Sequence, residues 1–392
     1  DKIKEHLVKI NSDGSILLNM DYFGFLDTKV MTNDNFSELF GSEPRVQESE
    51  ITQMECDIAK SIQVVTEEIV LLMAKHAYEI TGCKNICLAG GVALNCVSNG
   101  RLLREGIFDD VWIQPASGDA GGSLGCAFFA NASLYPSNFD RKEERNIQKG
   151  SYWGPSYSNE EIEAALTSYN FKFNKYKSEE RTKLIAKYLS EEKVVGHFSG
   201  RMEFGPRALG ARSILGDPRR ETTQSKLNLK IKYRESFRPF APTVLEQDIN
   251  EYFELEKPSP FMLLVASVQK NRCLSMPETL EKDLISKVNL KRSDIPAVTH
   301  VDYSARVQSV SESSHRDYFK LIETFKKLTS YGVVVNTSFN VRGEPIICTP
   351  LNALNCFMKT EMDVLSIGDY ILLKEAQNNH HIFSKVEHKN KE

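Results

Sequence analysis

A lysine and an arginine two positions apart, Lys232 and Arg234, lie in the most cationic stretch of the chain. From Arg201 to Arg238 there are ten Lys and Arg residues but only four Asp and Glu residues. Arg binds phosphate oxygens through paired N–H groups and Lys adds a compact charge, so this composition predicts a site for a small, highly charged anion. A solvated surface of salt bridges is the alternative, although interleaved Gly, Pro and Phe residues are less typical of such a surface.

Two further polar residues, Ser338 and Asn340, follow an apolar segment at 332–336 that predicts a central strand. Hydroxyl and amide groups at a strand end can bind phosphate or the polar edge of adenine. The same groups can also form a turn through hydrogen bonds to the local main chain. The residues alone leave both interpretations open.

The paired glycines Gly90 and Gly91 form a second candidate binding site. They separate residues 85–89, for which we expect a strand, from residues 92–105, for which we expect a helix. A strand–Gly-Gly–helix pattern brings main-chain N–H groups close to a bound nucleotide. Tight packing of the helix on the strand would explain the glycines equally well, because the pattern by itself is not specific.

Asp119 is a candidate metal ligand. It stands between glycines after a predicted strand at 110–114, at the strand end where α/β folds place their ligands. A carboxylate in this position could bind a divalent cation. The alternative is an N-cap for the small-residue helix expected over 121–134.

Both helices and strands must position these residues. A long helix is predicted from Ile51, because apolar residues recur every three or four positions as far as Leu72. Residues 137–150 are polar and charged, so we place a domain boundary there. The other expected elements are helices over 160–169, 182–189, 316–328 and 351–359, and strands over 15–18, 194–198, 261–268 and within 364–373.

Composition excludes several classes of protein. The chain has 392 residues, enough for two or three domains, and 49 basic against 53 acidic residues, a formal charge of −4. This balance argues against a dedicated nucleic-acid binder, and no apolar run is long enough to span a membrane. The eight Cys form no CxxC pair and are expected to be buried free thiols, which favours a cytoplasmic location.

Six motifs make the chain resemble the O-carbamoyltransferases that modify nodulation factors and antibiotics, from about residue 36 to about residue 374. They are LAGGVALN, PASGDAGG, MEFGPRALGARSILGDPR, FRPFAP, THVDYSARVQSV and NTSFNVRGEPI. The resemblance implies an α/β and α+β architecture, with one lobe of an actin/Hsp70-like (RNase H-like) domain followed by a YrdC-like mixed-sheet domain. On this basis residues 1–136 form the carbamoyl-transfer lobe, 137–150 a linker, 151–376 the carbamoyl-adenylate-forming domain and 377–392 a polar tail.

The resemblance also implies a two-step reaction. Carbamoyl phosphate and ATP, with Mg²⁺, yield carbamoyl-adenylate in the YrdC-like domain, and the actin-like domain passes the carbamoyl group to a substrate hydroxyl. The expected acceptor is a small molecule, a sugar or another natural product in a biosynthetic pathway. No nucleic-acid or membrane partner is expected, and the sequence gives no oligomeric state.

Residue roles follow from the same resemblance. Lys232-Tyr233-Arg234 and Ser338-Phe339-Asn340 match the two halves of the KxR…SxN signature of YrdC-like sites. The match predicts that Lys232 and Arg234 face Ser338 and Asn340 across one pocket and bind phosphate and carbamoyl oxygens. The catalytic candidates are Lys232, Arg234 and Arg207, and the candidates for substrate and nucleotide binding are Arg212, Arg238, Ser338, Asn340, Gly90 and Gly91.

Asp119 matches the aspartate of the family's metal site, which holds Fe²⁺ or another divalent cation. The other ligands of that site come from an HxxxH pair, and this sequence contains no HxxxH. We therefore expect a C-terminal fragment that lacks the first lobe of the actin-like domain. Such a fragment would bind metal weakly through Asp119 alone and would have an incomplete transfer site.

Two other functions stay open. The KxR…SxN signature is shared with enzymes that form threonylcarbamoyl-adenylate for tRNA modification, although the FGPRALG and FRPFAP motifs and the absence of a broad basic face disfavour that chemistry. A nucleotide-binding module without catalysis is the third hypothesis. ATP binding without pyrophosphate release would favour it.

Overall fold

The computed structural model describes residues 1–46, 49, 51–136, 148–234, 238–275, 288 and 290–377. By its internal contacts the chain divides into two compact units. The first comprises residues 1–88 and 97–113, and the second comprises 89–96 and 114–392. The linker predicted at 137–150 falls mostly outside the described residues, and a domain boundary at that point stays a prediction.

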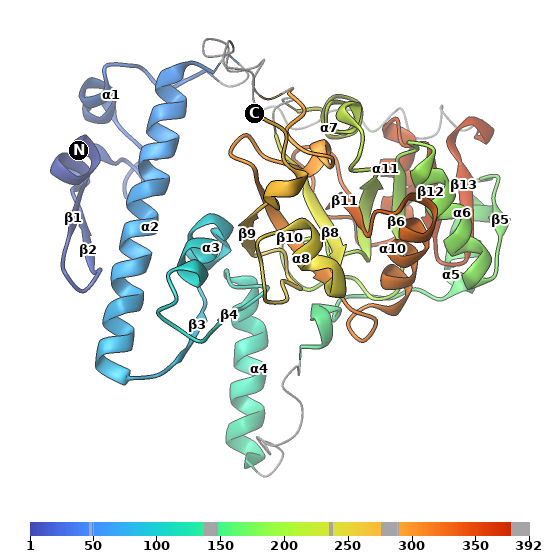
Figure 1. Cartoon of the computed structure of the whole chain (residues 1–392), viewed down its shortest axis with the longest axis horizontal. Coiled ribbons are helices and arrows are strands. Elements are labelled where there is room, and N and C mark those ends of the chain that lie inside the picture. The colour runs from blue at the N-terminus through green and yellow to red at the C-terminus, as the bar shows by residue number, and fades with distance from the viewer. Residues whose placement is uncertain are drawn as a thin grey trace. The chain divides into compact units, whose positions relative to one another are not determined.

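The first unit is built around one long helix, α2 (Gln53–Thr81), which is drawn in blue in Figure 1. Thr52 begins it in a capping box with Glu55, and Gly82 ends it in the left-handed conformation at φ 63°. Val65 of α2 packs in one apolar cluster with the start of the chain. The neighbouring elements are β1 (Val8–Ile10), antiparallel to β2 (Ile16–Leu18), and α1 (Asp34–Phe40).

A second apolar cluster joins the later part of α2 to a small parallel sheet. Leu71 and Ala74 of α2 pack with Leu102 and Phe108. The two strands are β3 (Asn85–Leu88) and β4 (Asp110–Ile113), and α3 (Cys96–Arg104) lies between them in sequence. The helix predicted over 92–105 therefore begins later than expected, because Gly91–Leu94 form a 3-10 turn and Asn95 leaves the helical region at ψ 87°.

The second unit contains a nine-stranded sheet in the order β5-β13-β12-β6-β7-β11-β8-β10-β9. The pairs β12–β6 and β10–β8 are parallel and the other neighbours are antiparallel, so the sheet is mixed, as predicted. The strands are β5 (Asn174–Lys175), β6 (Val195–Phe198), β7 (Arg212–Gly216), β8 (Ala241–Leu245), β9 (Leu264–Ser267), β10 (Ser304–Val310), β11 (Val333–Ser338), β12 (Val364–Ile367) and β13 (Tyr370–Leu373). The finer assignments, actin-like and YrdC-like, stay predictions.

Helices cover this sheet. In α6 and α10 the apolar faces, which include Ile185, Leu189, Ile322 and Phe325, pack in one cluster with strand residues such as Val334. Figure 1 shows these two helices beside one another against the strands. The helices of this unit are α4 (Ala120–Leu134), α5 (Asn159–Ser168), α6 (Ser178–Ser190), α7 (Glu221–Leu227), α8 (Ile249–Tyr252), α10 (Arg316–Thr329) and α11 (Pro350–Lys359).

Most sequence-based expectations for these elements are confirmed within one or two residues. The expected burial of the cysteines is wrong in part. All eight are free, but Cys83, Cys87 and Cys126 are exposed and Cys356 is buried. Cys87 is exposed because side chains alternate along β3, with Asn85 and Cys87 on the exposed face and Ile86 and Leu88 on the partly buried face. Among the described helices, none combines the length and the apolarity that crossing a bilayer requires.

Candidate functional site

Lys232 is the best-defined member of the predicted site. Its side chain is 3% exposed, and its Nζ donates to Ser338 Oγ at 3.1 Å, Asn340 O at 3.0 Å and Asn340 Oδ1 at 2.7 Å. It also bonds the Ser338 carbonyl oxygen. Ser338 Oγ donates to Asn340 Oδ1 at 2.7 Å. The predicted meeting of Lys232 with Ser338 and Asn340 is thus observed, as direct contact rather than across an open pocket.

Local backbone geometry explains how Lys232 reaches this position. The helix α7 continues into a π-helical turn, Asn228–Lys232, a local distortion that is frequent at functional sites. Tyr233 then adopts the left-handed conformation at φ 48°, ψ 52°, and its hydroxyl donates to the Lys359 carbonyl at 2.8 Å. The chain therefore turns sharply between Lys232 and Arg234, so the two side chains contact different partners.

The ammonium of Lys232 is held in competing environments. Four oxygens lie within reach of its three N–H groups and favour the charged form. Burial, with a smaller contribution from the positive charge of Arg234, lowers the pKa of Lys232 from 10.5 to about 7. Burial is the larger effect, so Lys232 gains or loses its proton near neutral pH.

Arg234 is oriented by a buried asparagine. Its Nε donates to Asn228 Oδ1 at 2.7 Å, and its guanidinium carbon lies 5.0 Å from the centre of the Phe240 ring. Asn228 is fully buried, and its Nδ2 donates to the Arg238 carbonyl at 2.8 Å. Asn228 therefore holds both sides of the loop that carries Arg234.

Arg306 belongs with these cations, and the sequence reasoning missed it. It lies in β10, opposite Val265 of β9. Burial, with smaller contributions from the positive charges of Arg207 and Arg234, lowers the pKa of Arg306 to about 10. The signal was present in the THVDYSARVQSV motif, but a single arginine in an apolar strand gives no indication of its spatial neighbours.

Two of these cations lack carboxylate partners in the part of the chain that the structure describes. Among the described residues, neither Arg207 nor Arg306 forms an ion pair with a carboxylate, and the buried Arg207 Nε has no hydrogen-bond acceptor. Clustered arginines that repel one another at partly buried positions are costly, so a bound anion is the natural counter-charge. We call Arg207, Lys232, Arg234 and Arg306 the cationic cluster.

Arg212 has a different role. It is fully buried, and its guanidinium donates to the carbonyls of Ser199, Gly200, Ala211 and Pro155 at 3.0–3.3 Å. The guanidinium carbon also lies 3.6 Å from the centre of the Phe198 ring. These contacts occupy both terminal nitrogens and leave only the buried Nε without a partner among the described residues, so we assign Arg212 to the scaffold.

Arg238 lies on the surface of the same unit. Its side chain is exposed, and its carbonyl accepts hydrogen bonds from Asn228 and Gln224. It follows the stretch 235–237, which lies outside the described residues. Its predicted contact with a substrate stays a prediction.

Gly90 and Asp119 lie in neighbouring loops. Gly90 has φ 98° and ψ 162°, which only glycine adopts readily, and its N–H donates to the Ser117 carbonyl at 2.7 Å. Gly91 has open space where a side chain would be. The segment 115–119 also lies close to Gly205, where an added Cβ would be 3.1 Å from the Pro115 carbonyl oxygen. The PASGD and EFGPR motifs are therefore neighbours in the second unit.

The residues around Asp119 do not fit a closed metal site. Within the described part of the chain, no three His, Cys, Asp or Glu side chains come together in a way that could hold a metal ion. Asp119 is exposed, and its side chain makes no capping hydrogen bond to α4, so the alternative role of N-cap is not observed either.

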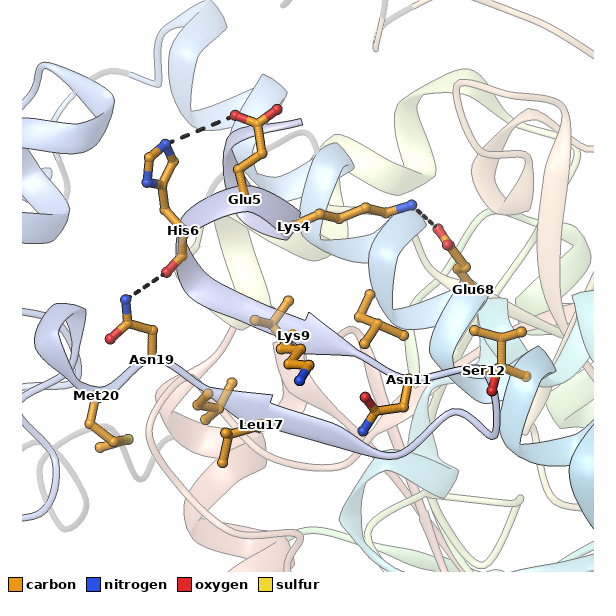
Figure 2. Close-up of a pocket in the computed structure, with 14 residues that line it drawn as sticks. Lys4, Glu5, His6, Lys9, Asn11, Ser12, Leu17, Asn19, Met20 and Glu68 are labelled. Carbon is orange, nitrogen blue, oxygen red and sulfur yellow. Dashed lines mark hydrogen bonds and ion pairs between the residues drawn. The ribbon is translucent and has the colours of Figure 1, made fainter.

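A surface depression in the first unit is the other candidate site. It has a volume of about 930 Å³ and lies beside β1 and β2 (Figure 2). Lys4 pairs with Glu68 at 2.5 Å, and His6 lies 3.9 Å from Glu5. Figure 2 shows these charged groups joined to one another along its edge. Lys9 also lines this depression and forms no ion pair among the described residues, but its side chain is exposed to water, so the depression holds no buried charge that a ligand must neutralise.

Comparisons with known proteins agree with the motifs. The family model for the carbamoyltransferase N-terminus matches residues 1–128, and the model for the carbamoyltransferase C-terminus matches residues 186–374. The second match contains the whole cationic cluster. The chain belongs to the carbamoyltransferase family.

Relatives share most of the chain. An uncharacterized protein of Synechocystis sp. is 52% identical over 382 residues, which are 96% of this chain and 62% of the relative. The nodulation protein NolNO of Sinorhizobium fredii is 39% identical over 83% of this chain and 45% of its own length. Nodulation protein NolO of Bradyrhizobium diazoefficiens is 38% identical over 82% of this chain and 55% of its own length. The chain thus spans about half to three fifths of the length of these relatives.

Proposed function

We propose that the second unit forms carbamoyl-adenylate from carbamoyl phosphate and ATP, as the first step of O-carbamoylation of a hydroxyl acceptor. The observation that carries this proposal is the buried Lys232, bonded to Ser338 and Asn340, in a cluster with Arg207 and Arg306, which form no ion pair with a carboxylate among the described residues. Membership of the carbamoyltransferase family supports carbamoyl as the group transferred. A cluster of preorganised cations suits a reaction in which negative charge moves between phosphate groups.

The proposed reaction cleaves carbamoyl phosphate first and ATP second. Carbamoyl phosphate and water give carbamate and phosphate, with cleavage of the bond between carbamoyl and phosphate. A carbamate oxygen then attacks the α-phosphorus of ATP, and pyrophosphate leaves with the bonding electrons. The products are carbamoyl-adenylate, phosphate and pyrophosphate. Lys232 and Arg306 would stabilise charge on the departing phosphates, and Mg²⁺ would enter with ATP.

Each cationic residue has a role that its surroundings suggest. The acceptors of two Lys232 hydrogen bonds, Ser338 Oγ and Asn340 Oδ1, are already oriented towards its Nζ. A substrate oxygen can therefore replace one of them at low cost. Arg207 and Arg306 can each offer a fork of N–H groups to phosphate oxygens. Arg234, fixed by Asn228, would bind the carbamoyl or α-phosphate oxygens.

We propose transfer of the carbamoyl group as the second step. The acceptor would be a hydroxyl of a sugar or another natural product, in the reducing cytoplasm that the free thiols favour. Gly90 and Gly91 would approach the adenylate through main-chain N–H groups. No step is assigned to a metal at Asp119, since the residues present do not fit one.

A product assay tests this proposal directly. The 392-residue chain is incubated with ATP, Mg²⁺ and one of three additions: carbamoyl phosphate, threonine with bicarbonate, or buffer. Of the three additions, only carbamoyl phosphate is expected to give pyrophosphate release. Release with threonine and bicarbonate would instead indicate threonylcarbamoyl-adenylate chemistry. ATP binding with no release in any of the three would indicate a nucleotide-binding module without catalysis.

A further inference from the structure

A buried glutamate, Glu203, organises the loop that carries Arg207. Its side chain is 4% exposed, and its Oε1 accepts three main-chain N–H groups, from Leu209 at 2.7 Å, Ala211 at 2.7 Å and Arg212 at 3.2 Å. One carboxylate oxygen thus holds the second half of the loop 203–212. In the sequence, Arg207 lies between Glu203 and the three residues whose N–H groups bind its carboxylate. These hydrogen bonds therefore close a loop of main chain that contains Arg207.

Other side chains hold the same loop by its carbonyls. Asn336 Nδ2 donates to the Ala208 carbonyl at 3.1 Å. Gln308 Nε2 and the Tyr152 hydroxyl both donate to the Leu209 carbonyl at 2.8 Å. These three residues come from β11, from β10 and from the segment before α5. The loop that follows Arg207 is therefore fixed from several directions.

The loop backbone is also shaped for this position. Gly205 has φ 142° and Gly210 has φ 116°, conformations in which other residues are strained. At Gly210 an added Cβ would lie 2.2 Å from the ring of Tyr318, so the loop lies directly on that buried ring. Glycines on either side of Arg207 let the backbone take this close path.

The glutamate is kept in an unfavourable environment. Burial raises the pKa of the Glu203 carboxyl, against the opposing effect of the three N–H groups. No hydrogen-bond partner for its Oε2 is found among the described residues. Stability alone would be served as well by an uncharged acceptor, because a buried carboxylate pays a large desolvation cost. The cost is expected where the position of the loop matters for function.

We propose that Glu203 is a positioning residue, which fixes the 203–212 loop so that Arg207 is presented to phosphate groups bound at the cationic cluster. This inference rests on the proposed function for the identity of the anion. Glu203 touches no ligand itself. It acts through Arg207, and its effect on binding should vanish when the Arg207 side chain is removed.

A double-mutant cycle tests this dependence. The probe is inorganic pyrophosphate, and its Kd is measured by titration calorimetry for the wild-type chain and for Glu203→Gln, Arg207→Ala and the double variant. We expect Arg207→Ala to weaken binding about 10-fold and Glu203→Gln about 3-fold or more. The double variant should bind no more weakly than Arg207→Ala, because the two residues act as one unit.

A purely structural role predicts a different result. If the losses for Glu203→Gln and Arg207→Ala multiply in the double variant, or if Glu203→Gln binds as the wild type does, the proposal is overturned. Failure of the wild-type chain to bind pyrophosphate would overturn the anion site as well. Binding by the wild type without pyrophosphate release in the product assay would overturn the proposed reaction and leave the role of Glu203 intact.

Two further variants guard against misfolding. Asp248→Asn removes a buried carboxylate of the same unit, which accepts from Lys326 at 2.7 Å and has no hydrogen bond to the loop. It should lower stability and leave the pyrophosphate Kd unchanged. Tyr152→Phe deletes only the hydroxyl that donates to Leu209. It should weaken binding about 2-fold in the wild-type background and not at all with Arg207→Ala, and a loss in both backgrounds would contradict the proposal.

Discussion

The depression beside β1 and β2 and the cationic cluster differ in how their charges are satisfied. In the depression, Lys4 pairs with Glu68, and both side chains are at least 40% exposed. In the cluster, Lys232 is 3% exposed, and Arg207 and Arg306 form no ion pair with a carboxylate among the described residues. Volume alone would favour the depression. The unpaired charge identifies the cluster as the better candidate, because only there would a ligand supply what the protein lacks.

Paired variants of Arg212 and Arg306 should give the largest effects, with opposite signs. Arg212→Met removes a guanidinium that satisfies four carbonyls and should lower the free energy of unfolding by about 3 kcal/mol or more. Arg306→Met removes a desolvated charge from a like-charge cluster and should raise it by about 1 kcal/mol. Chemical denaturation without ligand measures both. A loss of stability in Arg306→Met comparable to that in Arg212→Met would mean that Arg306 is part of the scaffold.

Removal of one lysine from the cationic cluster and one from the depression compares the importance of the two regions for the reaction. Lys232→Ala should slow pyrophosphate release with carbamoyl phosphate at least about 10-fold, since a hydrogen bond to a charged group contributes about 1.5–3 kcal/mol. Lys4→Ala should leave the rate unchanged, because it breaks only an exposed ion pair. The initial rate of release at saturating ATP is the measurement. Equal rates for Lys232→Ala and the wild type would remove Lys232 from the proposed mechanism.

The contribution of Lys232 to the stability of the folded chain should depend on pH. Folding lowers the pKa of Lys232 from 10.5 to about 7, so between these values the unfolded chain binds more protons at this lysine than the folded chain does. The contribution of Lys232 to stability is therefore least favourable below about pH 7 and improves as the pH rises towards 10.5. Thermal unfolding of the wild type and of Lys232→Met across this range should show the difference. Parallel profiles would contradict the lowered pKa.

Anion binding should follow the opposite trend. The ammonium form of Lys232 attracts phosphate, so the affinity for pyrophosphate should fall as the pH rises through about 7. The same titrations with Lys232→Met supply the control, in which this step should be missing. A step of equal size in the variant would assign the titration to another group.

The smallest effect is expected at Asp119. Its side chain is exposed and makes no capping hydrogen bond, so Asp119→Ala should change the free energy of unfolding by less than about 0.5 kcal/mol. The variant should also form carbamoyl-adenylate at the wild-type rate. A large loss of stability, or of the pyrophosphate release, would show that Asp119 has partners beyond those described.

The helices and strands, and the candidate residues that lie near one another in the chain, could be predicted from the sequence. The periodicity from Ile51 gave α2, apolar segments gave β6 and β11, and Lys232 and Arg234 stood out by their spacing. These features are local, because helices and strands impose periods of 3.6 and 2 residues on the apolar positions. The contact of Lys232 with Ser338 and Asn340 also followed, though only through a motif match.

Which cations share the site could not be predicted from the sequence and follows from the fold. Arg212 and Arg306 look alike in sequence, since each stands in an apolar strand, but one is surrounded by carbonyls and the other by positive charges. The difference arises because β10 and β7 are separated in the sheet by β11 and β8, and each strand meets different loops. Strand order and loop path depend on contacts between residues far apart in the chain, which the spacing of residue types along it does not encode.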